Sequence, residues 1–168
     1  MKTENTMRKV MIEKVLLSAG ATGDDLAKAK KLLDLVSGSK AQILTSTKRI
    51  PEFDVRPGLE VGTRVTLRGE KAIDTLKRLL GAVDNEISKK HLSENHFSFG
   101  IKEYIEIPGI EYQRDIGIRG FNVTVVFARA GTRVKLKKIK RGSVPKRQFI
   151  SKEEIITFMT EAFKTKFK

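Results

Sequence analysis

Lysine and arginine side chains are concentrated in one stretch of this sequence, between residues 129 and 147. Nine cations occur there without a single carboxylate. Like charges at this density repel one another, so the stretch needs a polyanion to neutralise it. Each phosphate neutralised is expected to add roughly 0.7–0.9 to the steepness with which log Kobs for binding falls against log salt concentration. The nine are Arg129, Arg133, Lys135, Lys137, Lys138, Lys140, Arg141, Lys146 and Arg147.

Two other interpretations of this stretch are a solvated, disordered linker and a patch for anionic lipid. The stretch adjoins strand and helix patterns, however, and it lacks the aromatic anchors of membrane-surface segments. We therefore expect a nucleic acid as its partner.

Groups that could support catalysis are sparse. His91 and His96 flank Glu94 in a polar loop, which permits at most a weak metal site, and a solvated loop is the better interpretation. The turn Gly20–Gly23 precedes a helix pattern but lacks the Lys-Ser/Thr of a P-loop and the third glycine of a dinucleotide site. The chain has no cysteine, which excludes disulfides, cysteine-ligated zinc and thiol catalysis. We expect no enzyme activity, no cofactor and no metal.

Two predicted strands place polar side chains on one face. Lys14 and Ser18 share a face in the first strand, and Arg64, Thr66 and Arg68 share one in the other. If helices cover the opposite face, these cations and hydroxyls are left to meet the phosphates and 2′-hydroxyls of RNA. An ordinary solvent-facing sheet explains the pattern equally well. Neither strand carries an aromatic pair, so recognition of RNA shape and backbone is favoured over base stacking.

A polar segment over residues 48–58 joins two strand patterns. It opens with Lys48 and Arg49, and it holds Ile50 and Phe53 with little room to bury both. A protruding basic loop of this kind can reach a nucleic acid. The alternative is that Phe53 packs back onto the sheet edge.

The charge of the whole chain is uneven. Its 168 residues carry 34 Lys and Arg against 20 Asp and Glu, a net charge of +14. Residues 129–168 account for a net +10, and the first 128 residues for a net +4. No apolar run approaches the roughly 20 residues of a membrane span, and the polar start is not a signal peptide. We expect a cytosolic, strongly basic protein.

Hydrophobic periodicity sets out the elements that position these groups. Strands are predicted over residues 8–19, 41–47, 59–67, 97–105 and 118–128, and helices over 24–36 and 70–83. A capping box from Ser151 to Glu154 opens a third helix, with Ile155, Met159 and Ala162 on its apolar side. This order predicts an α+β fold: a largely antiparallel sheet with helices packed on one face, plus a basic C-terminal extension ending in a helix. We expect a flexible N-terminal arm over 1–7, one RNA-binding domain over 8–128 and the basic extension over 129–168.

Three ordered motifs resemble the signature blocks of a ribosomal protein family. They run from Pro57 to Glu70, from Phe97 to Glu103 and from Ile107 to Tyr112. These blocks are similar to those of the universal large-subunit ribosomal protein L five family, and the resemblance spans about residues 10–128. The start, without the helical extension of bacterial members, and the basic tail are similar to the archaeal type.

The resemblance implies a structural constituent of the large subunit in the central protuberance. It implies contacts with 5S rRNA and large-subunit rRNA, a bridge to a small-subunit protein, a loop near P-site tRNA, and a monomer within the cytoplasmic ribosome without membrane contact. The implied 5S rRNA contacts are Lys14, Ser18, Ser39, Thr66 and Arg68, to which the polar face adds Arg64. The implied tRNA-facing loop holds Thr47, Lys48, Arg49, Ile50, Pro51, Phe53 and Arg56. The implied rRNA-binding tail holds Arg133, Lys135, Lys137, Lys138, Lys140, Arg141, Lys146 and Arg147.

Two alternative functions remain open from the sequence. One is a small RNA-modifying or phosphate-handling enzyme that uses the Gly20–Gly23 turn and the loop of His91 and His96. Such an enzyme would show a perturbed histidine titration or specific nucleotide binding. The other is a non-specific nucleic-acid chaperone, which would be indifferent to the fold of its RNA.

Overall fold

The computed structural model describes residues 5–168. The arm expected over residues 1–7 therefore falls largely outside the described residues, and within them Thr6–Arg8 form a short 3₁₀ turn. Over the described part of the chain, no helix is long and apolar enough to cross a membrane.

Six strands form one antiparallel sheet in the order β2-β3-β1-β7-β6-β5. β1 and β7 occupy its centre, and β1 is the longest strand. The strands are β1 (Met11–Gly20), β2 (Gln42–Thr45), β3 (Glu60–Leu67), β5 (Leu92–Ser93), β6 (His96–Ile101) and β7 (Phe121–Ala128).

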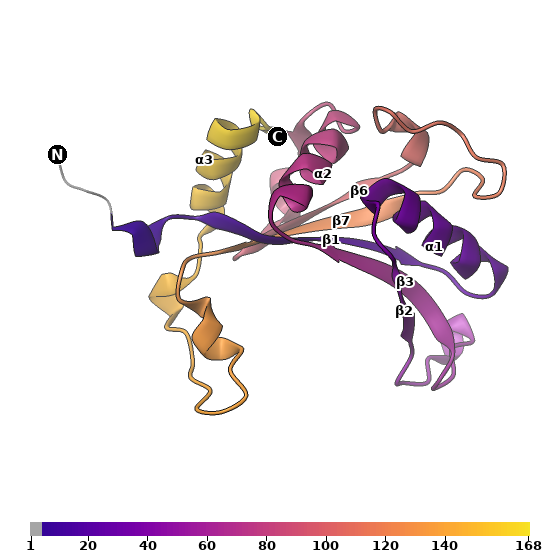
Figure 1. Cartoon of the computed structure of the whole chain (residues 1–168), viewed down its shortest axis with the longest axis horizontal. Coiled ribbons are helices and arrows are strands. Elements are labelled where there is room, and N and C mark those ends of the chain that lie inside the picture. The colour runs from indigo at the N-terminus through magenta and orange to yellow at the C-terminus, as the bar shows by residue number, and fades with distance from the viewer. Residues whose placement is uncertain (1–4) are drawn as a thin grey trace.

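Three helices lie together on one side of this sheet: α1 (Asp24–Ser37), α2 (Glu70–Gly81) and α3 (Lys152–Phe163) (Figure 1). α1 is capped at its C-terminal end by Gly38, whose left-handed backbone (φ 58°) suits glycine. α3 begins with the predicted capping box, in which Ser151 Oγ accepts from the Glu154 N–H and the Glu154 carboxylate accepts from the Ser151 N–H. The predicted α+β fold, with helices on one face of an antiparallel sheet, is confirmed.

The hydrophobic core lies between the helices and the inner face of the sheet. Alternate strand residues point into it, since successive side chains of a strand face opposite sides. Phe97 stacks against Phe99 and Phe127, with ring centroids 5.9 and 5.8 Å apart. Ile155 and Met159 of α3 are fully buried in the same cluster, so the C-terminal helix is built into the core of the sheet.

Several strand ends differ from the predictions: the first strand begins at Met11 rather than at residue 8, and the second ends at Thr45 rather than at residue 47. The strand predicted over 97–105 ends at Ile101, because Tyr104–Glu106 turn into a 3₁₀ helix that buries Tyr104. The strand predicted over 118–128 begins at Phe121, after an irregular connection. Alternation alone could not place these last two ends, because the apolar residues Tyr104, Ile105 and Ile118 lie just beyond the strands and extend the pattern.

Three further features differ from the sequence pattern. Ile73 of α2 is exposed although it lies at helical spacing from the buried Leu76 and Leu80, and Ala162 of α3 is exposed although the sequence predicts it on the apolar side of its helix. A parallel pair, β4 (Glu86–Ile87) and β8 (Lys166–Phe167), joins the C-terminus to the chain after α2. Two-residue strands are too short to show a periodicity, which is why the sequence did not predict this pair.

Candidate nucleic-acid interface

The sheet face opposite the helices is left uncovered, and its side chains are mostly polar. Ser18 of β1 pairs with Arg64 of β3 on one side and with Asn122 of β7 on the other. In the next row, Leu16 lies between Thr66 and Thr124. We call this surface the open face and define it by Lys14, Leu16, Ser18, Gln42, Arg64, Thr66, Ser98, Asn122 and Thr124.

The open face brings together four of the six residues predicted to contact 5S rRNA, namely Lys14, Ser18, Arg64 and Thr66. Their strand neighbours Val15, Leu17, Val65 and Leu67 are buried against the helices, so the side chains of the four polar residues point to the opposite face of the sheet. Hydrophobic alternation in β1 and β3 therefore points these polar groups outward.

Hydrogen bonds between neighbouring strands order part of this surface. Arg64 Nε donates to Gln42 Oε1 at 3.3 Å, and the hydroxyls of Ser98 and Thr124 are hydrogen-bonded at 3.0 Å. Hydroxyl and amide groups donate and accept, as do the 2′-hydroxyls of RNA, and Arg64 can also donate to phosphate. The chemistry of the face thus suits a ribose-phosphate backbone.

The other two predicted contacts, Ser39 and Arg68, lie beside the open face rather than on it. Ser39 sits partly buried in the connection between α1 and β2, where its N–H and C=O are hydrogen-bonded to Ser37 Oγ. Arg68 follows β3, with its Nη1 3.7 Å from Glu13 Oε1 and its side chain 59% exposed. A pair this open leaves Arg68 free to reach a phosphate.

The β2–β3 loop, residues 46–59, projects from the sheet on the side away from the helices (Figure 1). Ile50 and Val55 close it by exchanging two backbone hydrogen bonds of 2.9 and 3.1 Å. Pro51–Phe53 form a 3₁₀ turn at the tip. Phe53 is 72% exposed, so it does not pack against the sheet edge and is available to a partner.

The loop contributes little net charge. The seven residues predicted to face tRNA are all exposed. Lys48, Arg49 and Arg56 are offset by Glu52 and Asp54, which leaves a net +1. The loop is therefore suited to a local contact rather than to long-range attraction.

The basic segment, residues 129–147, forms a second projection on the same side of the sheet (Figure 1). It leaves the end of β7, makes 3₁₀ turns at Thr132–Lys135 and Lys146–Gln148, and returns to α3. Lys135 Nζ lies 5.9 Å from the ring centroid of Phe149. All eight predicted tail residues are exposed: Arg133, Lys135, Lys137, Lys138, Lys140, Arg141, Lys146 and Arg147.

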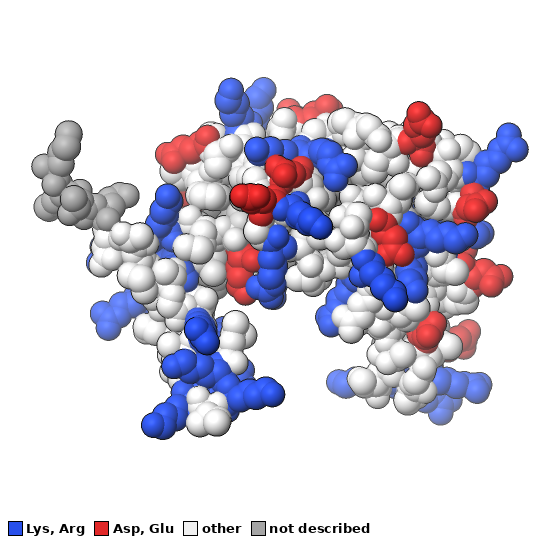
Figure 2. Space-filling view, in the orientation of Figure 1, with Lys and Arg blue, Asp and Glu red and all other residues white. Residues whose placement is uncertain are grey.

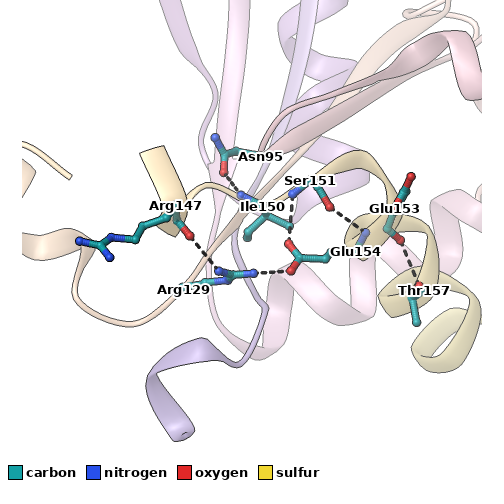
Figure 3. A network of polar contacts seen from close by, with 8 residues as sticks. All are labelled: Asn95, Arg129, Arg147, Ile150, Ser151, Glu153, Glu154 and Thr157. Atoms are coloured by element: carbon teal, nitrogen blue, oxygen red, sulfur yellow. Dashed lines mark hydrogen bonds and ion pairs between the residues drawn. The ribbon is translucent and has the colours of Figure 1, made fainter. Parts of the chain in front are cut away.

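Arg129, the ninth cation of the segment, is turned inward and is 13% exposed. Its Nη2 donates to Glu154 Oε1 at 2.5 Å and its Nη1 to the Arg147 carbonyl at 3.3 Å (Figure 3). The second oxygen of the same carboxylate accepts from the Ser151 N–H. Asn95 Oδ1 accepts from the Ile150 N–H at 2.8 Å. These contacts fix the root of the basic segment to the folded core.

The two projections flank the open face and form a saddle with it. Figure 2 shows the concave space between the two projections, with lysine and arginine gathered on both and most densely on the basic segment. Such an arrangement would attract a polyanion at long range through the cations of the projections and offer it the polar side chains of the open face at short range. It suits a nucleic-acid interface.

The groups considered for catalysis are not brought together. The Gly20–Gly23 turn follows the end of β1, whereas His96 begins β6 and pairs with Val126, whose other partner is Lys14. The two sites thus lie toward opposite ends of the sheet. Asp24 and Asp25 follow the glycine turn directly and would repel a phosphate there. Within residues 5–168, no group of three His, Asp or Glu side chains could hold a metal ion.

Comparison with known proteins identifies the family. A sequence model that describes the C-terminus of the ribosomal protein L5 family matches residues 60–158, from β3 into α3. The chain belongs to the ribosomal protein L5 family. The resemblance inferred from three sequence motifs is confirmed, and the matched region includes the whole basic segment.

Archaeal relatives match over nearly the full chain. The large ribosomal subunit protein uL5 of Nanoarchaeum equitans is 43% identical over 161 residues, which cover 94% of this chain and 95% of the relative. The uL5 proteins of Picrophilus torridus and Sulfolobus acidocaldarius are 37% and 38% identical, and cover 98% and 96% of this chain and 96% and 93% of the relatives.

Proposed function

We propose that this protein is a structural constituent of the large ribosomal subunit that binds 5S rRNA with its open face. The observation that carries the proposal is the saddle: a polar sheet face, free of helices, between the β2–β3 loop and the basic segment. The relatives, each named a large ribosomal subunit protein, support a place in the ribosome of the cytoplasm.

The open face and its edge supply the short-range contacts. Lys14, Arg64 and Arg68 donate to phosphates, while the hydroxyls of Ser18 and Thr66 bond to ribose groups. These few contacts determine which RNA binds, because they form together only when the RNA backbone follows the shape of the sheet.

The basic segment supplies attraction to the neighbouring large-subunit rRNA and so helps attach 5S rRNA within the central protuberance. If all eight of its exposed cations neutralise phosphates, a plot of log Kobs against log salt concentration has a slope of roughly −6 to −7. The attraction by the basic segment is then strong at low salt and weak at high salt.

The β2–β3 loop is the part proposed to approach P-site tRNA, with Lys48 and Arg49 as the principal contacts. The exposure of Phe53 and the projection of the loop beyond the sheet support this role. By family resemblance, the protein also bridges to a small-subunit protein and acts as a monomer within the ribosome.

The test is a binding comparison with full-length protein, 5S rRNA and an unrelated RNA duplex at several salt concentrations. We expect tighter and steeply salt-dependent binding to 5S rRNA. Equal affinity for both RNAs at moderate salt would contradict the proposal and favour a non-specific chaperone. Specific binding of a free nucleotide would favour the enzyme alternative.

Substitutions are the right way to test the basic segment, because deletion of residues 129–168 would remove Ile155 and Met159 from the core. Lys137→Ala with Lys138→Ala should lower the salt slope by about 1.4–1.8. The matched control removes two exposed lysines, Lys71 and Lys77, from the helical side of the sheet, and it should leave the slope unchanged.

A further inference from the structure

One end of the open face is hollowed. A cavity of about 480 Å³ lies where β1 and β6 end and β7 begins. It is outside the set of residues predicted to bind RNA, apart from Ser18 at its margin. The groups that line it and bear on its chemistry are Ser18, Gly20, Gly100, Lys102, Gly120 and Asn122.

The floor of this hollow is bare backbone because its glycines carry no side chains. A Cβ at Gly120 would collide with the backbone oxygens of Ile101 and Lys102, so this position cannot hold a larger residue without a shift. A Cβ at Gly100 would lie 3.3 Å from Asn122 Oδ1. At Gly20, by contrast, a Cβ would meet nothing within 4 Å. A flat molecule can therefore approach the strands closely here.

Polar groups border the floor on two sides. Asn122 and Ser18 are paired residues of β7 and β1, and the exposed Asn122 amide offers donors and an acceptor. Lys102 is exposed at the end of β6, and Arg64 pairs with Ser18 on the next strand. An amide beside a flat floor suits the edge of a nucleobase, and the two cations suit its phosphates.

We propose that this hollow holds one unpaired nucleotide of the bound RNA. Its base lies over Gly20 and the neighbouring Gly120, and Asn122 hydrogen-bonds its edge. The inference rests on the proposed function, because it assumes that the open face binds structured RNA. A helical duplex does not present single bases to a flat sheet, whereas RNA loops offer unstacked bases. Base identity is thus read by an amide at this site, without an aromatic platform.

Gly20→Ala tests the floor with little effect on the protein, because the added methyl touches no other residue. Any ligand that lies against the floor would meet that methyl. Gly81→Ala is the matched control: it adds a methyl at the end of α2, on the helical side, where the nearest atom is a Pro108 carbon at 3.7 Å. Asn122→Ala tests the edge contact, and thermal unfolding confirms that all three variants are folded.

The probe is 5S rRNA, compared with an unrelated blunt duplex. Gly20→Ala and Asn122→Ala should each raise the Kd for 5S rRNA about tenfold, the loss of one good base contact. Their salt slopes and their Kd for the duplex should not change, and Gly81→Ala should match the wild type. Chemical probing should show an unpaired base that the wild type protects and Asn122→Ala leaves reactive, while backbone protections persist.

An unchanged Kd of folded Gly20→Ala for 5S rRNA would overturn the inference and leave the proposed function standing. An equal loss of affinity for both RNAs would also overturn it, because the hollow would then contact backbone only. A wild type that does not distinguish 5S rRNA from the duplex would instead overturn the proposed function, and the inference with it.

Discussion

Replacement of Glu154 by glutamine isolates the ion pair that fixes the root of the basic segment. Glutamine keeps an oxygen that accepts from the Ser151 N–H, so the capping box of α3 is retained. What is lost is the negative charge opposite Arg129, whose Nη2 lies 2.5 Å from Glu154 Oε1. The variant therefore reports on the pair rather than on the helix cap.

The magnitude follows from the burial of the two partners. A hydrogen bond to a charged group contributes about 1.5–3 kcal/mol, and an exposed ion pair about 0.2–1 kcal/mol. The Arg129 side chain is 13% exposed and that of Glu154 is 44% exposed, so the pair lies between these cases. We expect Glu154→Gln to lower the free energy of unfolding by about 1–1.5 kcal/mol. Glu154→Ala should cost about 1 kcal/mol more, because the cap is lost as well.

The assay is urea denaturation of Glu154→Gln, Arg129→Met and the double variant, with Glu153→Gln as the matched control. Glu153 is an exposed acid in the same first turn of α3, so its loss removes the same favourable charge at the helix start. The double-mutant cycle should give a coupling of about 1 kcal/mol. Hydrogen exchange over residues 129–149 should accelerate in Glu154→Gln but not in Glu153→Gln. A coupling below about 0.3 kcal/mol, or equal effects of the two glutamines, would refute the reasoning.

Three further changes test other parts of the molecule. Thr66→Ala combined with Arg68→Ala should weaken 5S rRNA binding by roughly 1–3 kcal/mol, and an unchanged Kd of the folded variant would remove that end of the sheet from the site. Phe53→Ala should change the free energy of unfolding by less than about 0.5 kcal/mol, because the ring is exposed, and should leave 5S rRNA affinity intact; a larger loss would show that the ring packs in solution. The hydrogen bond from Lys168 lowers the pKa of Glu86, so this contact is intact above the ordinary glutamate pKa and is lost as the pH falls through the lowered value. Hydrogen exchange of the β8 amides, corrected for the intrinsic rate, should therefore become faster as the pH is lowered through that value. Glu86→Gln should already show the faster exchange at neutral pH. Equal exchange rates in the variant and the wild type at neutral pH would contradict this prediction.

Most of the fold could be predicted from local patterns. Alternation in β1 and β3, the apolar stripe of α1 and the capping box at Ser151 follow from sterics and hydrogen bonding within a few residues. Strand ends and the β4–β8 pair could not be predicted, because they depend on tertiary contacts such as the burial of Tyr104.

The candidate site was predicted only in part, for a related reason. The polar set of β1 and β3 was found because each strand shows which of its faces is polar. Asn122 and the glycine hollow were missed, because they become neighbours of Ser18 only when β7 pairs with β1. Ser39 was assigned to the site by resemblance, and its place beside the open face depends on how α1 connects to β2.

The sequence by itself determined the composition of the interface: a dense run of cations, a set of strand hydroxyls and amphipathic helices able to cover one side of a sheet. These are properties of charge and periodicity, which act over short stretches of chain. Tertiary structure alone decided that the loop and the basic segment project on the same side, that Arg129 is held by Glu154 and that Phe53 is exposed. Each of these depends on packing between residues far apart in the sequence, because the strand register and the shared core set where their side chains meet.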